Sequence, residues 1–60
     1  MHAQIAATLR HLKQAITHLH DARLIIEGTD KATAQIIAEL IHATREQIRR
    51  LELHIGNSQG

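Results

Sequence analysis

The chain has 60 residues, of which 43% are apolar and 22% charged, and it contains no cysteine, proline or aromatic residue. This length fits a single domain with a small core, and the composition excludes disulfides and base stacking on aromatic rings. A net charge of +1 makes nucleic acid or an anionic membrane an unexpected partner. Met1-His2-Ala3-Gln4 is not typical of a secretory signal, and no apolar run approaches the roughly 18 residues of a membrane span. We therefore expect a cytoplasmic chain, or one without a natural compartment if it is designed.

The first predicted element is a helix over about residues 3–27. Its apolar side chains follow one another at steps of about four and three residues, with one longer step across Arg23. This spacing is typical of an amphipathic helix with one apolar stripe. The stripe consists of Ile5, Leu9, Leu12, Ile16, Leu19 and Ile26.

A turn is predicted at Glu27-Gly28-Thr29-Asp30, the one internal break in a helix-favouring sequence. Gly28 is expected to end the first helix in the left-handed conformation. Asp30, or Thr29, has a side-chain oxygen that can accept from the free amides at the start of the next helix.

The second predicted element is a helix over about residues 30–55, which Gly56 should end. Residues 56–60 are expected to form a frayed tail. The apolar spacing repeats that of the first helix, with Thr44 as its one polar member. Two arms of similar length joined by a short turn predict an all-α antiparallel hairpin that occupies residues 1–60 as a single domain.

The apolar arc of the second helix predicts self-association. It covers about 160°, which is wider than one partner helix can bury. A homodimer would give a four-helix bundle, and a trimer would give a six-helix one. The arc runs through Ala34, Ile41, Ile37, Ile48, Ile55, Leu51, Leu40 and Ile36. The predicted interface comprises Ile5, Leu9, Leu12, Ile16, Leu19, Arg23, Ile26, Ile36, Ile37, Leu40, Ile41, Thr44, Ile48, Leu51, Glu52 and Ile55.

The distribution of charge favours a head-to-tail dimer. The open end of the hairpin is net positive and the loop end net negative, although surface charges contribute only tenths of a kcal/mol each. Arg23 lies on the centre line of the first apolar stripe, where an unpaired cation would be costly. Two partners are predicted for it: Glu52 of a second copy, or Glu27 one turn further along its own helix.

Thr44 occupies a core position near the middle of the second helix. Its hydroxyl can donate to a carbonyl of its own helix. Alternatively, it can form a polar layer that selects one register of the bundle.

Six histidines are the compositional oddity of the chain, because histidine is the commonest metal ligand and titrates near neutral pH. His11 and His18 lie far from the apolar centre of the first helix, which indicates a solvated face. His2, His20 and His54 border the predicted seam, and they are the candidate ligands for zinc or copper. The sequence predicts no definite metal site, because a firm one needs three or four ligands.

Glu39 and His42 resemble the Glu-x-x-His motif of carboxylate-bridged di-iron bundles. The matching glutamate on the first helix is missing, and Glu39, His42 and Glu46 point away from the predicted core.

Catalysis is not predicted. No serine precedes position 58, there is no glycine-rich loop, and no strained turn exposes a threonine hydroxyl. Residues at the open end form a modest basic cluster that could bind RNA weakly. They are Arg10, His11, Lys13, Arg45, Arg49 and Arg50.

The equal arms and the Gly28-Thr29-Asp30 turn resemble idealised or de novo designed helix–loop–helix proteins that self-assemble. The layout is also similar to that of Rop, a small plasmid RNA-pairing regulator that forms a dimer of hairpins. Residues 10–18, with imidazoles seven apart, resemble small histidine-rich bacterial metal-binding helices. These resemblances imply a structural self-association module, with a histidine-based metal-binding or pH-responsive assembly, or a weak RNA binder, as alternatives.

Overall fold

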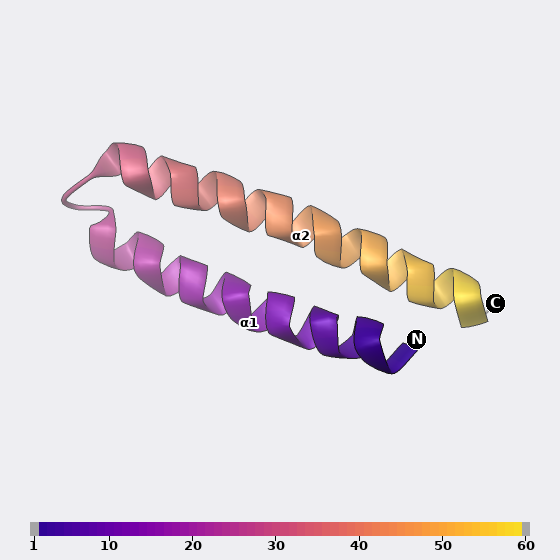
Figure 1. The fold of residues 1–60 in the computed structure, drawn as a ribbon. Coiled ribbons are helices and arrows are strands. Elements are labelled where there is room, and N and C mark those ends of the chain that lie inside the picture. The colour runs from indigo at the N-terminus through magenta and orange to yellow at the C-terminus, as the bar shows by residue number, and fades with distance from the viewer. Residues whose placement is uncertain (1, 60) are drawn as a thin grey trace.

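The computed structural model describes the backbone of residues 2–59 and the side chains of residues 3–56. Helix α1 spans His2–Ile26 and helix α2 spans Lys31–Gln59. The two helices lie side by side and antiparallel, with both chain ends at the open end of the hairpin (Figure 1). The result is a rod of 47 × 15 × 11 Å, which confirms the predicted all-α hairpin. Within the described residues, neither helix is apolar over a length that could cross a membrane.

The turn closes without a residue of positive φ, so the prediction of a left-handed Gly28 is wrong. The carbonyl oxygen of Ile26 accepts from the amides of both Thr29 and Asp30, at 2.9 Å each. This carbonyl at the end of α1 is therefore satisfied without a left-handed residue. A Cβ added at Gly28 would contact nothing within 4 Å, so glycine is not sterically required there.

Asp30 is the N-cap of α2, as predicted. Its Oδ1 accepts from the Thr33 amide at 3.0 Å, and its Oδ2 accepts from the Thr33 hydroxyl at 2.7 Å. Its carbonyl oxygen accepts the first helical bond, from the amide of Ala34 at 3.1 Å. The Thr33 hydroxyl, followed by the Thr33 amide, lowers the pKa of the Asp30 carboxyl because both donate to its charged form.

The C-terminal end of α2 differs from the prediction. The helix continues through Gly56 to Gln59, whereas the sequence predicts an end at 55. A single glycine costs a helix only about 1 kcal/mol, which the continuing backbone hydrogen bonds can offset. The frayed tail over 56–60 concerns behaviour in solution and stays a prediction; Gly60 lies outside the described residues.

The two helices meet along a seam with a heptad pattern, in which positions a and d face the other helix. In α2 the a positions include Ala34, Ile41 and Ile48, which are only 5%, 3% and 8% exposed. No described residue of α1 is buried to that degree, so the core is a single line of α2 side chains covered by half-buried neighbours. The half-buried seam residues of α1 are Ile5, Leu9, Leu12, Ile16, Leu19, Arg23 and Ile26. Those of α2 are Ile37, Thr44, Leu51 and Ile55.

Candidate interaction surface

One long edge of the hairpin, which we call the charged edge, is held by polar contacts between the helices. Lys13 Nζ lies 3.2 Å from Glu52 Oε2, and Arg45 Nη2 lies 3.1 Å from His20 Nε2. All four residues occupy heptad position e, four residues after an a position. Seven residues separate the two contacts on each helix, so both report the same antiparallel register.

The opposite long side, which we call the apolar face, carries little charge. Because the helices are antiparallel, positions g of both helices line this side. Positions d lie next to them in the seam between the helices, and positions c lie at the outer margins of the face. Among the described residues at these positions, Arg50 is the one with a full charge. Its apolar members are Ile5, Leu12, Ala15, Leu19, Ala22, Ile25 and Ile26 of α1, with Ile36, Ile37, Leu40, Ala43 and Leu51 of α2.

Large side chains of the apolar face remain open to solvent in the single hairpin. Ile36 is 57% exposed and Leu40 is 50% exposed, although both belong to the arc that the sequence assigns to an interface. Helix α1 covers position a of α2 and leaves positions c and g uncovered. This is the geometry expected when an apolar arc is wider than one partner helix.

Sequence reasoning missed three exposed apolar residues: Leu24, Ile25 and Leu53. Ile25 lies at the outer margin of the apolar face, whereas Leu24 lies on the side of the charged edge and Leu53 on the outside of α2. The sequence offered one signal, and it concerns Ile25. The apolar stripe has a step of seven residues across Arg23 that ends at Ile26, and Ile25 directly precedes that residue.

Arg23 has its within-chain partner in this structure. Its Nε lies 3.9 Å from Glu27 Oε2, an ion pair too long for a hydrogen bond, and this Nε is buried without a hydrogen-bond partner. The guanidinium borders a groove of about 190 Å³ at the loop end, which Lys31 and Gln35 also line. The pair with Glu52 of a second copy stays a prediction, because a single chain does not test it.

Thr44 makes the predicted local bond. Its hydroxyl donates to the Leu40 carbonyl oxygen at 2.7 Å, one turn earlier in α2. The hydroxyl is thereby satisfied within its own helix, so a second copy packed over Thr44 would not leave it unpaired. Its role in selecting a register stays a prediction.

Of the three predicted metal candidates, His20 and His54 have side chains within the described residues. His20 is half-buried, and its Nε2 accepts from the Arg45 guanidinium. His54 is exposed near the end of α2, and the side chain of His2 lies outside the described residues. Within the described part of the chain, no three His, Asp or Glu side chains are grouped so that they could hold an ion.

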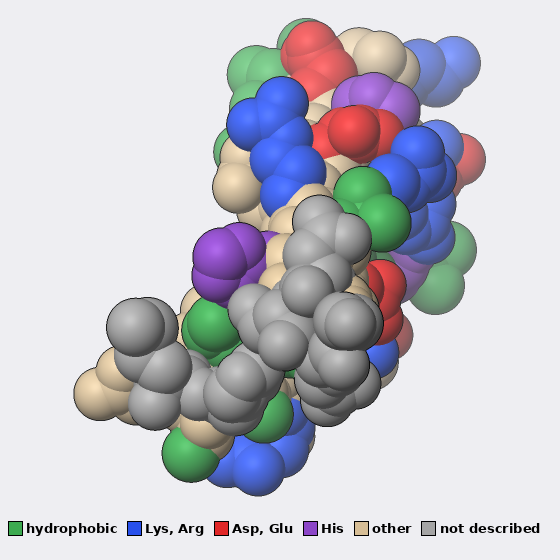
Figure 2. All heavy atoms as spheres, turned by 90° about the vertical axis from the view of Figure 1, so that its right-hand side faces the viewer, with side chains coloured by type: hydrophobic (Ala, Val, Ile, Leu, Met, Phe, Trp, Pro, Cys, Tyr) green, Lys and Arg blue, Asp and Glu red, His purple; other side chains and the backbone are tan. Residues whose placement is uncertain are grey.

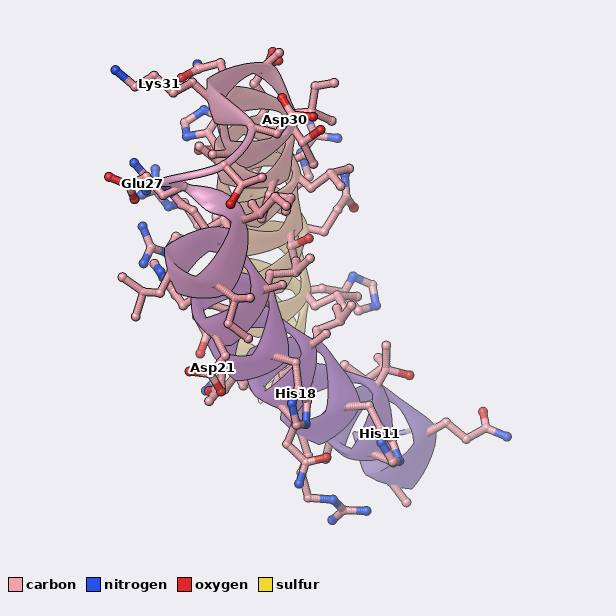
Figure 3. All side chains as sticks on the ribbon, turned by 90° about the vertical axis from the view of Figure 1, so that its left-hand side faces the viewer. His11, His18, Asp21, Glu27, Asp30 and Lys31 are labelled. Carbon is pink, nitrogen blue, oxygen red and sulfur yellow. The ribbon has the colours of Figure 1, made fainter. Side chains whose placement is uncertain are left out.

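His11 and His18 lie on the outer side of α1, where both project in the same direction as Asp21 (Figure 3). Both rings are exposed, and neither makes a hydrogen bond or ion pair within the described chain. They occupy position c, the outer margin of the apolar face. This placement agrees with the sequence analysis, which puts them far from the apolar centre.

Basic side chains are not gathered in one place. Viewed from the open end, they are spread around the molecule and alternate with acidic ones (Figure 2). Arg49 Nη1, for example, lies 3.9 Å from Glu46 Oε1. The surface turned to the viewer therefore has no single basic patch of the kind that tracks a phosphate backbone.

Comparison of the chain with models of known families, with curated proteins and with solved structures gives no match. The fold and the apolar face therefore carry the functional argument.

Proposed function

We propose that the chain is a structural self-association module without catalytic activity. The apolar face of one hairpin packs against that of a second copy and completes a four-helix bundle. The observation that carries this proposal is the exposure of Ile36 and Leu40 on a face that has almost no charge. Exposed apolar side chains that are contiguous, rather than scattered, are typical of an interaction site.

The accessible surface of the hairpin supports the same conclusion. It amounts to 4675 Å². A compact monomer of 6.7 kDa is expected to expose about 3,900 Å². The excess of about 800 Å² equals what each partner buries in a standard protein interface. One chain therefore exposes, beyond a compact fold, about the area that a dimer would cover.

A second copy fits this face better than a partner of strong charge. A two-fold dimer places the same surface on both sides, so an interface of this kind must be complementary to itself. An apolar face with one cation per copy meets that condition, whereas the charged edge does not. Arg23 and Glu52 lie toward the charged edge and stay outside the proposed contact, with Glu27 and Lys13 as their partners.

Sedimentation of the wild type and of two matched variants tests this proposal. We expect wild-type dimers, whereas Leu40→Glu should weaken association at least about tenfold, because a carboxylate would be buried without a partner. Leu53→Glu is the control, since Leu53 lies on the same helix, is 61% exposed and is outside the apolar face. A trimer would replace the four-helix bundle by a six-helix one. A stably folded wild-type monomer would contradict the proposal.

A further inference from the structure

We propose that the two copies pair head to tail, and that His11 of one copy and His18 of the other then bind a divalent transition-metal ion. The inference rests on the proposed self-association, because the site contains residues from both chains. It assigns a use to His11 and His18, which make no hydrogen bond or ion pair within the described part of the chain.

Charge sets the direction of pairing. The loop end, residues 16–42, has four acidic residues against Arg23 and Lys31, whereas the open end has five Lys and Arg residues against Glu46 and Glu52. Loop-to-loop pairing would bring like charges together, and head-to-tail pairing brings opposite charges to the same level. Each surface contact contributes at most about 1 kcal/mol, so head-to-tail pairing is favoured only by the net excess of opposite charges at each level.

Helix α1 of each copy then lies antiparallel to α1 of the other. This helix spans residues 2–26, so its midpoint is residue 14. His11 precedes the midpoint by three residues and His18 follows it by four, so His11 of one copy stands level with His18 of the second. Position c, which both occupy, is at the margin where the two α1 helices meet. The symmetry axis repeats this pair about 10 Å away along the helix.

The donor set suits a transition-metal ion. Asp21 lies three residues after His18, on the same side of α1 (Figure 3), which brings its Cβ to roughly 5–6 Å from that of His18. Two imidazole nitrogens and one carboxylate oxygen are ligands of zinc, copper and nickel, with water in the fourth position. Within one chain, His11 and His18 are about 10 Å apart along the helix and cannot hold one ion. The second copy completes the site.

Complementation between two inactive variants tests the site. Zinc binding is measured by titration calorimetry on dimers whose mass is first established by sedimentation in chelator. We expect about one ion per chain in the wild type. Neither His11→Ala nor His18→Ala should bind at this site, because in each homodimer both sites lack one imidazole. His42→Ala is the control, since His42 is exposed on α2 away from the apolar face, and it should bind as the wild type does.

An equimolar mixture of the two inactive variants, unfolded and refolded together, should regain binding. Half of its dimers contain both chains, and each of these has one intact site, which restores about one quarter of the wild-type capacity. Dimers that regain no binding, or a His42→Ala variant that loses it, would overturn the site and leave the proposed self-association standing. A wild-type chain that remains monomeric in chelator contradicts the self-association itself.

Discussion

Along the charged edge, Lys13 and His20 reach across to Glu52 and Arg45, whereas along the apolar face Ala15 and Ala22 lie on the same side as Leu40. Both sides follow from one heptad pattern, but polar contacts join the helices on the first and exposed apolar side chains lie on the second. The exposed polar contacts of the charged edge agree with one register of the two helices but contribute little free energy. Small residues on α1 leave the large residues of α2 uncovered. In the proposed dimer, the association energy would therefore come from the apolar face and not from the charged edge.

The largest effect is expected in the seam between the two sides. Ile41→Ala removes the most buried side chain, and we expect it to lower the free energy of unfolding by about 2–5 kcal/mol. Urea denaturation followed by circular dichroism measures this loss, which should be present at every protein concentration. A loss below that of the exposed control Leu53→Ala would place the core elsewhere.

The apolar face is expected to behave differently. Ile36→Ala should cost about 1–3 kcal/mol, and only at protein concentrations where dimers form, because Ile36 is then buried by the second copy. Thermal melts over a hundredfold range of concentration separate this contribution from that of Ile41. Equal destabilisation at all concentrations would show that Ile36 stabilises the hairpin alone.

The sequence predicts the apolar face better than it predicts the charged edge. Apolar periodicity identifies both helices, the seam and the arc that contains Ile36 and Leu40, because burial imposes a period on the sequence. It does not identify the Lys13–Glu52 and Arg45–His20 contacts. Periodicity gives the face of each residue, but the axial register also depends on the turn, and long side chains reach along the helix. One signal for these contacts was available. Lys13 and His20 are seven residues apart on α1, and their partners Glu52 and Arg45 are also seven apart on α2.

The turn shows a second limit. A glycine at a helix end is compatible with a left-handed cap and with a right-handed turn, and the sequence around Gly28 favours neither. The choice depends on which amides reach the Ile26 carbonyl. The same ambiguity applies to Gly56, which the sequence predicts as a helix end, because one glycine does not outweigh continued helical hydrogen bonding.

Gly28→Ala tests this geometry away from both sides. Because Gly28 has no positive φ and an added Cβ has open space, alanine should stabilise the hairpin by about 0.4–1 kcal/mol through a less flexible unfolded chain. Denaturation at a fixed concentration measures the change. A destabilised variant would indicate a left-handed Gly28 after all.

Acid should weaken the start of α2. The pKa of Asp30 is lowered in the folded chain, so its contribution to stability is present above its ordinary pKa and is lost as the pH falls through the lowered value. Asp30→Asn keeps an acceptor for Thr33 and removes the titration. We expect the melting temperature of this variant to fall less steeply with decreasing pH than that of the wild type. Parallel curves for the two proteins would contradict this role.

The smallest effect is expected on the charged edge. Lys13→Gln removes the 3.2 Å ion pair with Glu52, whose two side chains are both more than half exposed. Such pairs contribute about 0.2–1 kcal/mol, and salt screens them. The stability difference from the wild type should therefore shrink between low and high ionic strength, with the dimer affinity unchanged. A loss of dimer affinity in this variant would mean that association uses the charged edge. An interface that pairs Arg23 with Glu52 of a second copy would then be favoured over one formed by the apolar face.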